Sequence, residues 1–460
     1  MENNRAQWTS SLGFILAAAG SAIGLGNIWK FPRMAYANGG GAFILVYLVI
    51  VVLIGATVML TEFSLGRSFR QNVVGTLRSV NKKFTIVGGM AILTGFIIIS
   101  YYSHVGGWVV KYFVAYVTNP GAVFADPVNY FLVDVLGMGT DFPVQGAVIF
   151  PFIFMAIVAV TVALGVNAGI ERLNKVLMPA LFVLLIILFF RGVTIPGGGE
   201  GLKYLLVPDF SALSGGAILA ALGQAFFSLS LGMSIMVTYG SYLPKEDNLV
   251  KSTFTVCGLD TLIAFLAGFA TIPVAFAAGI EIASGGGAGF AFISLASAFE
   301  SMPLGGLFGA LFYLLLLFAA LTSAVSIMEG VIAFVIEQFK VSRVAAVTGI
   351  SIVTYFIGML YTVSQACKEI KGIWIDVNGV TNPSLADFME FCTDKFLMPL
   401  GALFTCLVVG WYWGVGKVKE EIETGGHHKF ALEGVYSICV KFIAPIAILI
   451  IVLGGFGVFG

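Results

Sequence analysis

Charge is the property that this chain has least of. Only 10% of its 460 residues are charged, whereas 59% are hydrophobic, and the mean hydropathy is +1.00. Soluble domains have roughly 25% charged residues. The composition therefore excludes a soluble globular protein and indicates a polytopic membrane protein.

Cysteine is scarce as well. The chain has five cysteines, an odd number, and no CxxC pair. Cys257, Cys406 and Cys439 lie inside or at the edge of apolar runs, so metal and redox roles are not supported. Cys367 and Cys392 could meet in one loop, although a free thiol is the favoured state of each.

Catalytic signatures are also missing. No His/Glu zinc motif, GxSxG sequence or pair of catalytic acids occurs in the apolar segments, which argues against an intramembrane enzyme. Gly24-Leu25-Gly26 is no nucleotide fingerprint, because Trp29 occupies the position of the third glycine. Nothing in the sequence indicates an organic cofactor, a nucleic acid or an obligate protein partner.

Long apolar runs dominate the chain. Crossing ~30 Å of hydrocarbon takes about 20 residues, and eleven runs of about this length or more are found. They cover residues 10–36, 41–66, 84–115, 146–165, 174–192, 215–242, 252–280, 304–336, 342–363, 394–415 and 435–457. The N-terminal segment has no recognisable cleavable signal, so the first span is expected to stay in place.

Charges between the spans predict the orientation. Basic residues precede span 1 and cluster in the loops after spans 2, 4 and 6, whereas the connection 116–145 has acidic residues and no Lys or Arg. By the positive-inside rule the N-terminus is cytoplasmic and this connection faces outward. The outward loops lack Asn-x-Ser/Thr sequons, which fits a protein of a bacterial inner membrane.

Glycines interrupt the first span. Gly20, Gly24 and Gly26 each weaken a helix interior by about 0.5–1 kcal/mol relative to alanine, which favours an unwound segment near residues 22–26. Freed carbonyls there could coordinate a cation, and freed N–H groups could receive a carboxylate. Close helix packing through small residues explains the same glycines equally well.

Span 6 repeats this anomaly with GQAFFSLSLG at 223–232. Interrupted helices at the first position of two sets of five spans are typical of an inverted-repeat transporter, with the site where the breaks meet. We therefore predict an all-α integral membrane protein with broken helices 1 and 6 in a 5+5 repeat and one additional helix. Residues 1–192 and 215–415 form the repeats, 193–214 an extracellular loop, and 416–460 a cytoplasmic loop and span 11.

Few polar residues lie within the spans. Asp260 shares its membrane half with the break in span 6, where a carboxylate could offset part of the desolvation of a cation. Glu62 and Glu329 are interpreted as structural acids at broken helix ends. The adjacent Thr322 and Ser323 hydroxyls could bond back to the preceding turn, and His104 is interpreted as a packing residue.

The interrupted segments resemble the neurotransmitter:sodium symporters, in particular the bacterial amino-acid transporters with the LeuT fold and eleven spans. The resemblance covers nearly the whole chain. Its most specific parts are GSAIGLGNIWKFP at 20–32, NGGGA at 38–42, Glu62 with Gly66 and Arg67, QAFFSLSLG at 224–232 and LTS at 321–323.

The resemblance implies two sodium ions, bound by hard oxygen ligands as a small cation requires. The first would be held by the Ala22 carbonyl, Asn27, Ser228, Asp260 and the substrate carboxylate. The second would be held by the carbonyls of Gly20, Ile23 and Ala319 and the hydroxyls of Thr322 and Ser323.

The resemblance also implies a substrate site between the two breaks. The substrate carboxylate would lie near Leu25, Gly26 and the Tyr102 hydroxyl, and its ammonium near Ala22, Phe227 and Ser230. The side-chain pocket would be shaped by Ile98, Met233, Ser323 and Ile327, with Phe227 as a lid.

Two positions in this site bear on the choice of substrate. Gly24 leaves room for a carboxylate, whereas monoamine carriers of the family have an aspartate there. Met233 stands where leucine-selective relatives have phenylalanine, and methionine is flexible and adaptable. We therefore expect a neutral amino acid with a bulky aliphatic or aromatic side chain, and not glycine or an acidic amino acid.

Two departures from the family pattern concern charge. Asp260 replaces a frequent asparagine, and Ala264 occupies the position of a chloride-linked serine or of an acid. The fixed negative charge has moved to Asp260, so we expect it to provide the charge compensation and transport to be independent of chloride.

The gates are expected by the same resemblance. Lys30 would pair with Glu390 above the site, with Asp394 as the alternative partner. On the inner side the path would be closed by Arg5, Glu337 and Tyr242, with Trp8 packed beneath.

The function expected from these features is sodium-coupled symport that imports an amino acid by alternating access. A gated cation channel is one alternative, but it predicts a ring of like residues, whereas the polar groups here converge on one pocket. An intramembrane enzyme is the other.

Overall fold

The computed structural model describes residues 6–139, 144–280, 286–366, 383–426, 428–456 and 458. Over these residues the chain is helical, and β-structure is limited to a bridge between Gly40 and Pro208. Cys392 has a free thiol, and Cys367 lies outside the described residues. The all-α fold class predicted from the sequence is confirmed.

Nine stretches of the described chain are long and apolar enough to cross a membrane. They are Gly41–Phe69 (α3, Gly41–Ile50; α4, Ala56–Phe69), Lys82–Thr118 (α6, Thr85–Thr118), Val144–Ala163 (α9, Phe150–Ala163), Val166–Thr194 (α10, Arg172–Thr194), Leu249–Ala277 (α14), Gly305–Phe339 (α17), Arg343–Ala366 (α18), Leu385–Trp413 (α19, Leu385–Phe391; α20, Met398–Leu407) and Glu433–Gly455 (α22, Glu433–Ile438; α23, Ala444–Gly455).

The other two predicted spans are the broken ones. Span 1 is α1 (Ser11–Ala22) followed by Gly26–Ala37, which contains α2 (Phe31–Ala37), and the two parts are bent by 53°. Span 6 is α12 (Gly215–Ser228) and α13 (Ile235–Gly240). Each of the eleven predicted spans thus has a helical counterpart.

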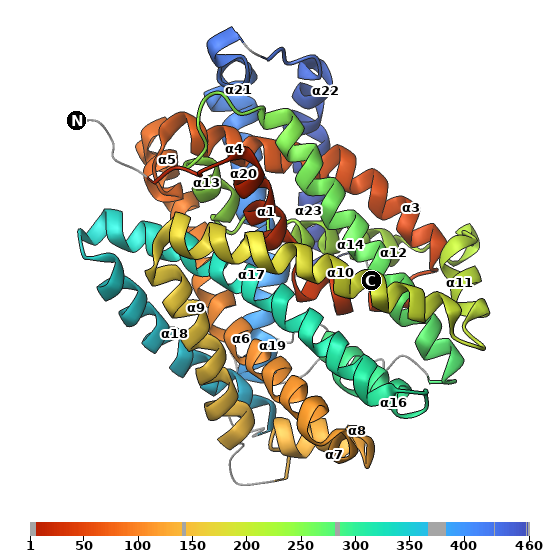
Figure 1. The fold of residues 1–460 in the computed structure, drawn as a ribbon. Coiled ribbons are helices and arrows are strands. Elements are labelled where there is room, and N and C mark those ends of the chain that lie inside the picture. The colour runs from red at the N-terminus through yellow and green to blue at the C-terminus, as the bar shows by residue number, and fades with distance from the viewer. Residues whose placement is uncertain are drawn as a thin grey trace.

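Short helices cover the two ends of the bundle. Figure 1 places the N-terminal segment, α5 (Val73–Val80), α21 (Val415–Ile422) and α22 at one end, and α7 (Pro120–Phe124), α8 (Pro127–Asn129) and α16 (Leu295–Glu300) at the other. The segments predicted to face the cytoplasm therefore share one end, and those predicted to face outward share the other.

Two spans begin earlier than predicted, because charged residues hid their first turns. The fifth begins at Val166 rather than at 174, and Glu171 there pairs with Lys175 at 2.7 Å. The tenth begins at Leu385 rather than at 394, and the Glu390 carboxylate accepts a 2.6 Å hydrogen bond from Tyr361. In both cases the helix includes, before the apolar run, an acidic residue whose carboxylate is bonded to another side chain.

The break in span 1 lies where the glycines predict it. Helix α1 ends at Ala22, Ile23 is extended, and helical structure resumes at Gly26. A Cβ at Gly24 would lie 2.6 Å from the Ser323 hydroxyl, and one at Gly26 2.8 Å from the Phe227 ring, so a larger residue at either position would displace that side chain. The glycines therefore serve both the break and the approach of neighbouring side chains.

The break in span 6 is held open by left-handed backbone. Ser230, Gly232 and Ser234 have φ values of 54°, 75° and 73°, a region that costs roughly 1–2 kcal/mol for a residue with a Cβ. Gly232 has to be a glycine, because a Cβ would clash with the Met398 carbonyl. Its N–H donates to the Glu62 carboxylate at 2.8 Å, which agrees with a structural role for that buried acid.

Candidate transport site

The two breaks enclose a cavity of about 20 Å³ near the middle of the bundle. Its walls come from α1 and the residues after it, α6, the α12–α13 break and α17. All eleven residues predicted for the substrate site line it: Ala22, Gly24, Leu25, Gly26, Ile98, Tyr102, Phe227, Ser230, Met233, Ser323 and Ile327. Ser21 and Ser228 complete the wall.

The backbone freed by the first break faces the Tyr102 hydroxyl. The Leu25 N–H donates to this hydroxyl at 3.3 Å, and Asn27 accepts a hydrogen bond from the Gly24 N–H at 3.1 Å. Gln224 donates to the Gly26 carbonyl at 3.0 Å and ties α12 to the break. Donors and a hydroxyl thus converge where the substrate carboxylate was predicted.

The first predicted cation site is a connected set of oxygen-bearing side chains. The Asp260 carboxylate is fully buried. It accepts hydrogen bonds from the Asn27 amide at 2.7 Å and the Ser228 hydroxyl at 2.9 Å. Asn27 also donates to Ser228 at 3.0 Å. Side chains from three distant segments are thereby brought together, and Ala22 lines the adjoining cavity.

Tyr47 is a member of this set that the sequence did not reveal. Its hydroxyl lies 3.4 Å from the second carboxylate oxygen of Asp260, and the side chain is buried. A tyrosine in an apolar run is usually interpreted as a residue of the hydrophobic core. The hydroxyl group of Tyr47 was the one feature of the sequence that could have indicated a polar role. Tyr47 belongs to α3, so α3 also contributes to the site.

The second predicted cation site lies between α1 and α17. The Ser323 hydroxyl donates to the Ser21 carbonyl at 3.0 Å and lies 3.4 and 3.5 Å from the carbonyls of Gly20 and Ile23. The Thr322 hydroxyl is 3.1 Å from the Ala319 carbonyl. Three of the five predicted ligands, the Ser323 hydroxyl and the carbonyls of Gly20 and Ile23, therefore lie together with the Ser21 carbonyl, whereas Thr322 and Ala319 contact each other on α17.

The alternative interpretation of Thr322 and Ser323 holds for one of the two hydroxyls. Thr322 bonds back to the Phe318 and Ala319 carbonyls of its own helix. Ser323 instead reaches across to α1. Sequence alone could not separate these residues, because they are adjacent on the same helix.

Above the cavity, Lys30 is paired with Asp394 rather than with Glu390. The ammonium lies 2.9 Å from the Asp394 carboxylate and 3.9 Å from the centre of the Phe227 ring. Glu390, one turn before Asp394, accepts its hydrogen bond from Tyr361. The alternative partner is therefore the one engaged in this structure, because the preferred acid is held by a tyrosine.

On the inner side the predicted gate residues are bound to different partners. Tyr242 donates to Glu329 at 2.7 Å, and Glu329 is ion-paired with Arg343. Trp8 is packed against Tyr242 and donates to the Tyr239 carbonyl at 3.1 Å.

Of the remaining inner-gate residues, Glu337 lines one cavity together with Tyr242 and Arg343. Glu337 accepts hydrogen bonds from the N–H and the side-chain amide of Asn72, at 3.0 and 2.6 Å. Arg5 lies outside the described residues, so its part in the gate stays a prediction.

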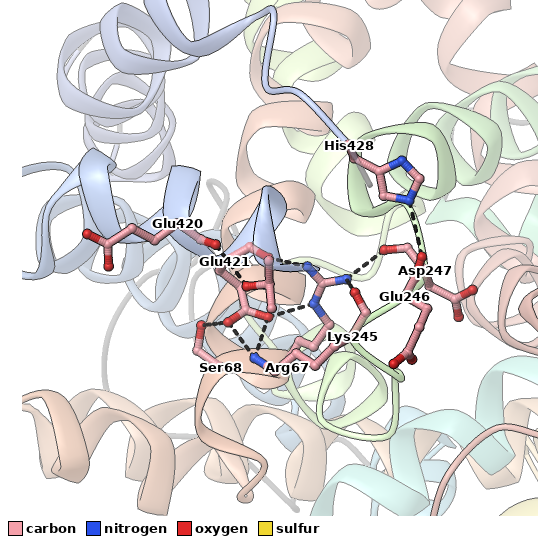
Figure 2. A network of polar contacts seen from close by, with 9 residues as sticks. Arg67, Ser68, Lys245, Glu246, Asp247, Glu420, Glu421 and His428 are labelled. Carbon is pink, nitrogen blue, oxygen red and sulfur yellow. Dashed lines mark hydrogen bonds and ion pairs between the residues drawn. The ribbon is translucent and has the colours of Figure 1, made fainter. Parts of the chain in front are cut away.

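A second buried network ties three segments together at the same end (Figure 2). The Arg67 guanidinium donates to the Glu421 carboxylate at 2.7 Å and to the Asp247 carbonyl at 2.6 Å. Lys245 and Ser68 also bind Glu421, at 2.6 and 2.8 Å. Burial raises the pKa of the Asp247 carboxyl above its usual range. The network joins α4 and the loop before α14 to α21.

A cavity between two broken helices, with freed backbone and hydroxyl groups at one end and apolar side chains at the other, is the construction of a membrane transporter. The family model for the sodium:neurotransmitter symporter family matches residues 5–122 and 120–459. The chain belongs to this family, whose members are transporters and not enzymes.

Individual relatives extend this likeness over the whole chain. An uncharacterised sodium-dependent transporter of Bacillus subtilis is 35% identical, with 99% of both chains covered. Another, of Methanocaldococcus jannaschii, is 34% identical over 91% of this chain and 84% of that protein. The crystal structure of MhsT in complex with L-phenylalanine matches 98% of this chain and 100% of that one, with a TM-score of 0.87 and 38% identity. The fold is accordingly the LeuT type, and transport depends on sodium.

Proposed function

We propose that the protein uses an inward sodium gradient to import a neutral hydrophobic or aromatic L-amino acid. The main observation in support is that the cavity has two different ends, with freed backbone and hydroxyl groups at one and apolar side chains at the other. Ile98, Met233 and Ile327 form the apolar part. An L-amino acid has the same division, with charged α-groups at one end and a side chain at the other.

The α-groups would bind to the broken backbone. The Leu25 and Gly26 N–H groups and the Tyr102 hydroxyl would receive the carboxylate, and carbonyls near Ala22 and Phe227 would receive the ammonium. Gly24 keeps this space open, since a Cβ would lie within 2.6 Å of the Ser323 hydroxyl. The bound L-phenylalanine of MhsT supports a bulky neutral substrate.

Two sodium ions would accompany the substrate. The Ala22 carbonyl, Asn27, Ser228, Asp260 and the substrate carboxylate would bind the first, so that binding of ion and substrate is coupled through a shared ligand. The second would lie between α1 and α17, where it links the broken helix to a long continuous one. A channel is disfavoured, because the oxygens converge on one enclosed cavity rather than on a ring of like residues.

Asp260 would also provide the negative charge that this site needs. It is fully buried beside the first cation site, and Ala264 one turn later has no hydroxyl for an anion. A chloride ion within a few ångströms of the Asp260 carboxylate would be repelled by several kcal/mol in such poorly screened surroundings. Chloride would therefore be excluded and transport would not require it.

The proposed topology follows the charge pattern. The N-terminus would face the cytoplasm of a bacterial inner membrane, with the inverted repeats at 1–192 and 215–415 joined by the outward loop 193–214. Residues 416–460 would add a cytoplasmic loop and the last span. The outer gate would use Lys30 with Asp394 or Glu390, and the inner gate Arg5, Trp8, Tyr242 and Glu337.

Uptake into proteoliposomes tests the substrate and the driving force. Labelled phenylalanine, tryptophan and leucine should accumulate when sodium is higher outside, and not when potassium replaces it. Glycine and glutamate should fail to compete. Tight glycine binding without competition by any bulky amino acid would contradict the proposal.

Chloride dependence tests Asp260. Uptake by the wild type should be the same when gluconate replaces chloride, whereas Asp260→Asn should need chloride or lose sodium coupling. A wild type that needs chloride would rule out the assigned charge compensation.

A further inference from the structure

The buried glycines of α6 do not all have the same reason to be glycine. A Cβ at Gly88, Gly106 or Gly107 would clash with Val74, Phe154 or Pro151, so close packing requires these three. Gly89 is exposed and a Cβ there would meet nothing within 4 Å.

Gly95 fits neither group. It is buried in the middle of α6, yet an added Cβ would be 3.5 Å from the Met233 carbonyl and from Val331, and 3.9 Å from Ile327. These are ordinary van der Waals distances. Alanine would therefore fit without strain and would favour the helix more than glycine does. Helix packing alone does not account for this glycine.

Gly95 lies directly next to the side-chain end of the cavity. Ile98 and Tyr102, three and seven residues later on the same face of α6, line the cavity. Met233 and Ile327 line it as well, and an added Cβ would contact the backbone carbonyl of the first and the side chain of the second. The space left by the missing side chain is therefore behind the apolar wall of the site.

The small size of the cavity means that its wall must move when a large substrate binds, and the space at Gly95 is available for this movement. The cavity is about 20 Å³, which is room for roughly one water molecule. A large aromatic side chain needs far more room, so part of the wall has to move when it enters. Tyr102 is fixed by its bond to Leu25, whereas Met233 is unbranched and adaptable. The methyl-sized space at Gly95 lies beside the Ile327 side chain, which can be displaced into it.

We infer that Gly95 is a specificity-determining residue: the methyl-sized volume it leaves unfilled receives the displaced Ile327 side chain and sets the upper size limit of the substrate. The inference rests on the proposed amino-acid transport. Filling this volume should discriminate against the largest side chains and spare small ones, because only the large ones displace the wall.

The test compares Gly95→Ala with Gly89→Ala, which adds the same methyl to the same helix at a position with open surroundings. Sodium-dependent equilibrium binding of tryptophan, leucine and alanine is measured for both variants and the wild type. One methyl group in an apolar pocket changes affinity by roughly tenfold or more. We expect Gly95→Ala to weaken tryptophan relative to alanine by about this factor, and Gly89→Ala to leave the ratio unchanged.

A compensating change guards against an indirect effect. Ile327→Val removes one methyl group from the wall, so Gly95→Ala combined with Ile327→Val should regain tryptophan affinity. An unchanged tryptophan-to-alanine ratio in Gly95→Ala, or an equal loss for all three amino acids, would overturn the inference while the proposed function stands. A wild type without sodium-dependent binding of any of them would overturn the proposed function and the inference with it.

Discussion

The cavity is closed very differently on its two sides. On the outer side one ion pair, Lys30 with Asp394, lies over the Phe227 ring, and the two side chains are 21% and 24% exposed. On the inner side Glu329 is completely buried and is held by both Tyr242 and Arg343. In the outer ion pair both partners are partly exposed, whereas in the inner ion pair Arg343 is 25% exposed but the acid is completely buried and has a second partner.

The difference shows which side is harder to open. Exposed ion pairs contribute ~0–1 kcal/mol, whereas removing one partner of a buried pair costs ~3–5 kcal/mol. Substrate should therefore reach the site by a small rearrangement on the outer side. Inner opening has to replace several buried contacts, which makes it the step that binding of ions and substrate must favour.

The largest effect on stability is expected from the second buried network on the inner side, which is centred on Arg67 and Glu421. Arg67→Met removes the fully buried cation that pairs with Glu421 and the donor of hydrogen bonds to three backbone carbonyls, and should lower the free energy of unfolding by ~3–5 kcal/mol. Thermal unfolding in detergent measures this. Lys245→Met is the matched control, because Lys245 binds the same carboxylate but is 36% exposed. Equal losses of unfolding free energy in Arg67→Met and Lys245→Met would contradict the expectation that the buried cation stabilises the protein more than the exposed one.

A smaller effect is expected at the inner gate itself. Arg343→Gln leaves the Glu329 carboxylate with the Tyr242 hydroxyl alone, and should shift the balance toward the inward-open state by ~2 kcal/mol, about thirtyfold. Spin labels at the exposed Leu12 on α1 and Val176 on α10 should then show a larger population at long distance. Lys340→Gln, an exposed residue of the same end, is the control. No change in the distances would show that this pair does not hold the gate.

The breaks and the site could be predicted from sequence because glycine spacing and the positions of hydroxyls are local properties. Gly24 and Ser323 line the cavity, and Asp260 is bonded to Asn27 and Ser228 beside it, while their roles in binding stay predictions. Charge pairing could not be predicted in the same way. Whether Lys30 meets Glu390 or Asp394 depends on a third residue, Tyr361, which occupies one of the two acids. The same applies to Tyr47, whose hydroxyl is only meaningful once α3 is placed beside α14.

At the outer closure we expect a modest effect. Lys30→Gln removes the ion pair and the contact with the Phe227 ring, which together are worth ~1–2 kcal/mol at this exposure. Substrate release from the sodium-bound protein should accelerate about five- to thirtyfold, as measured by chase with unlabelled substrate. Sodium affinity should change little, because Lys30 touches neither predicted sodium site. A slower release would contradict the assignment of Lys30 to the closure.

The smallest expected effect is the coupling energy between Lys30 and its acidic partner, which distinguishes Asp394 from Glu390. The structure pairs the ammonium with Asp394, while Glu390 accepts the Tyr361 hydroxyl, so the two acids should differ in their coupling to Lys30. In a double-mutant cycle on the release rate, Lys30→Gln and Asp394→Asn should show a coupling energy of ~0.5 kcal/mol, and Lys30→Gln with Glu390→Gln close to none. The Tyr361→Phe variant sharpens the result, because freeing Glu390 from its hydrogen bond should allow it to compete for Lys30 and raise the second coupling. Coupling to Glu390 in the otherwise unchanged protein would mean that the ammonium alternates between the two acids. The outer closure would then resemble the inner one, a network rather than a single contact.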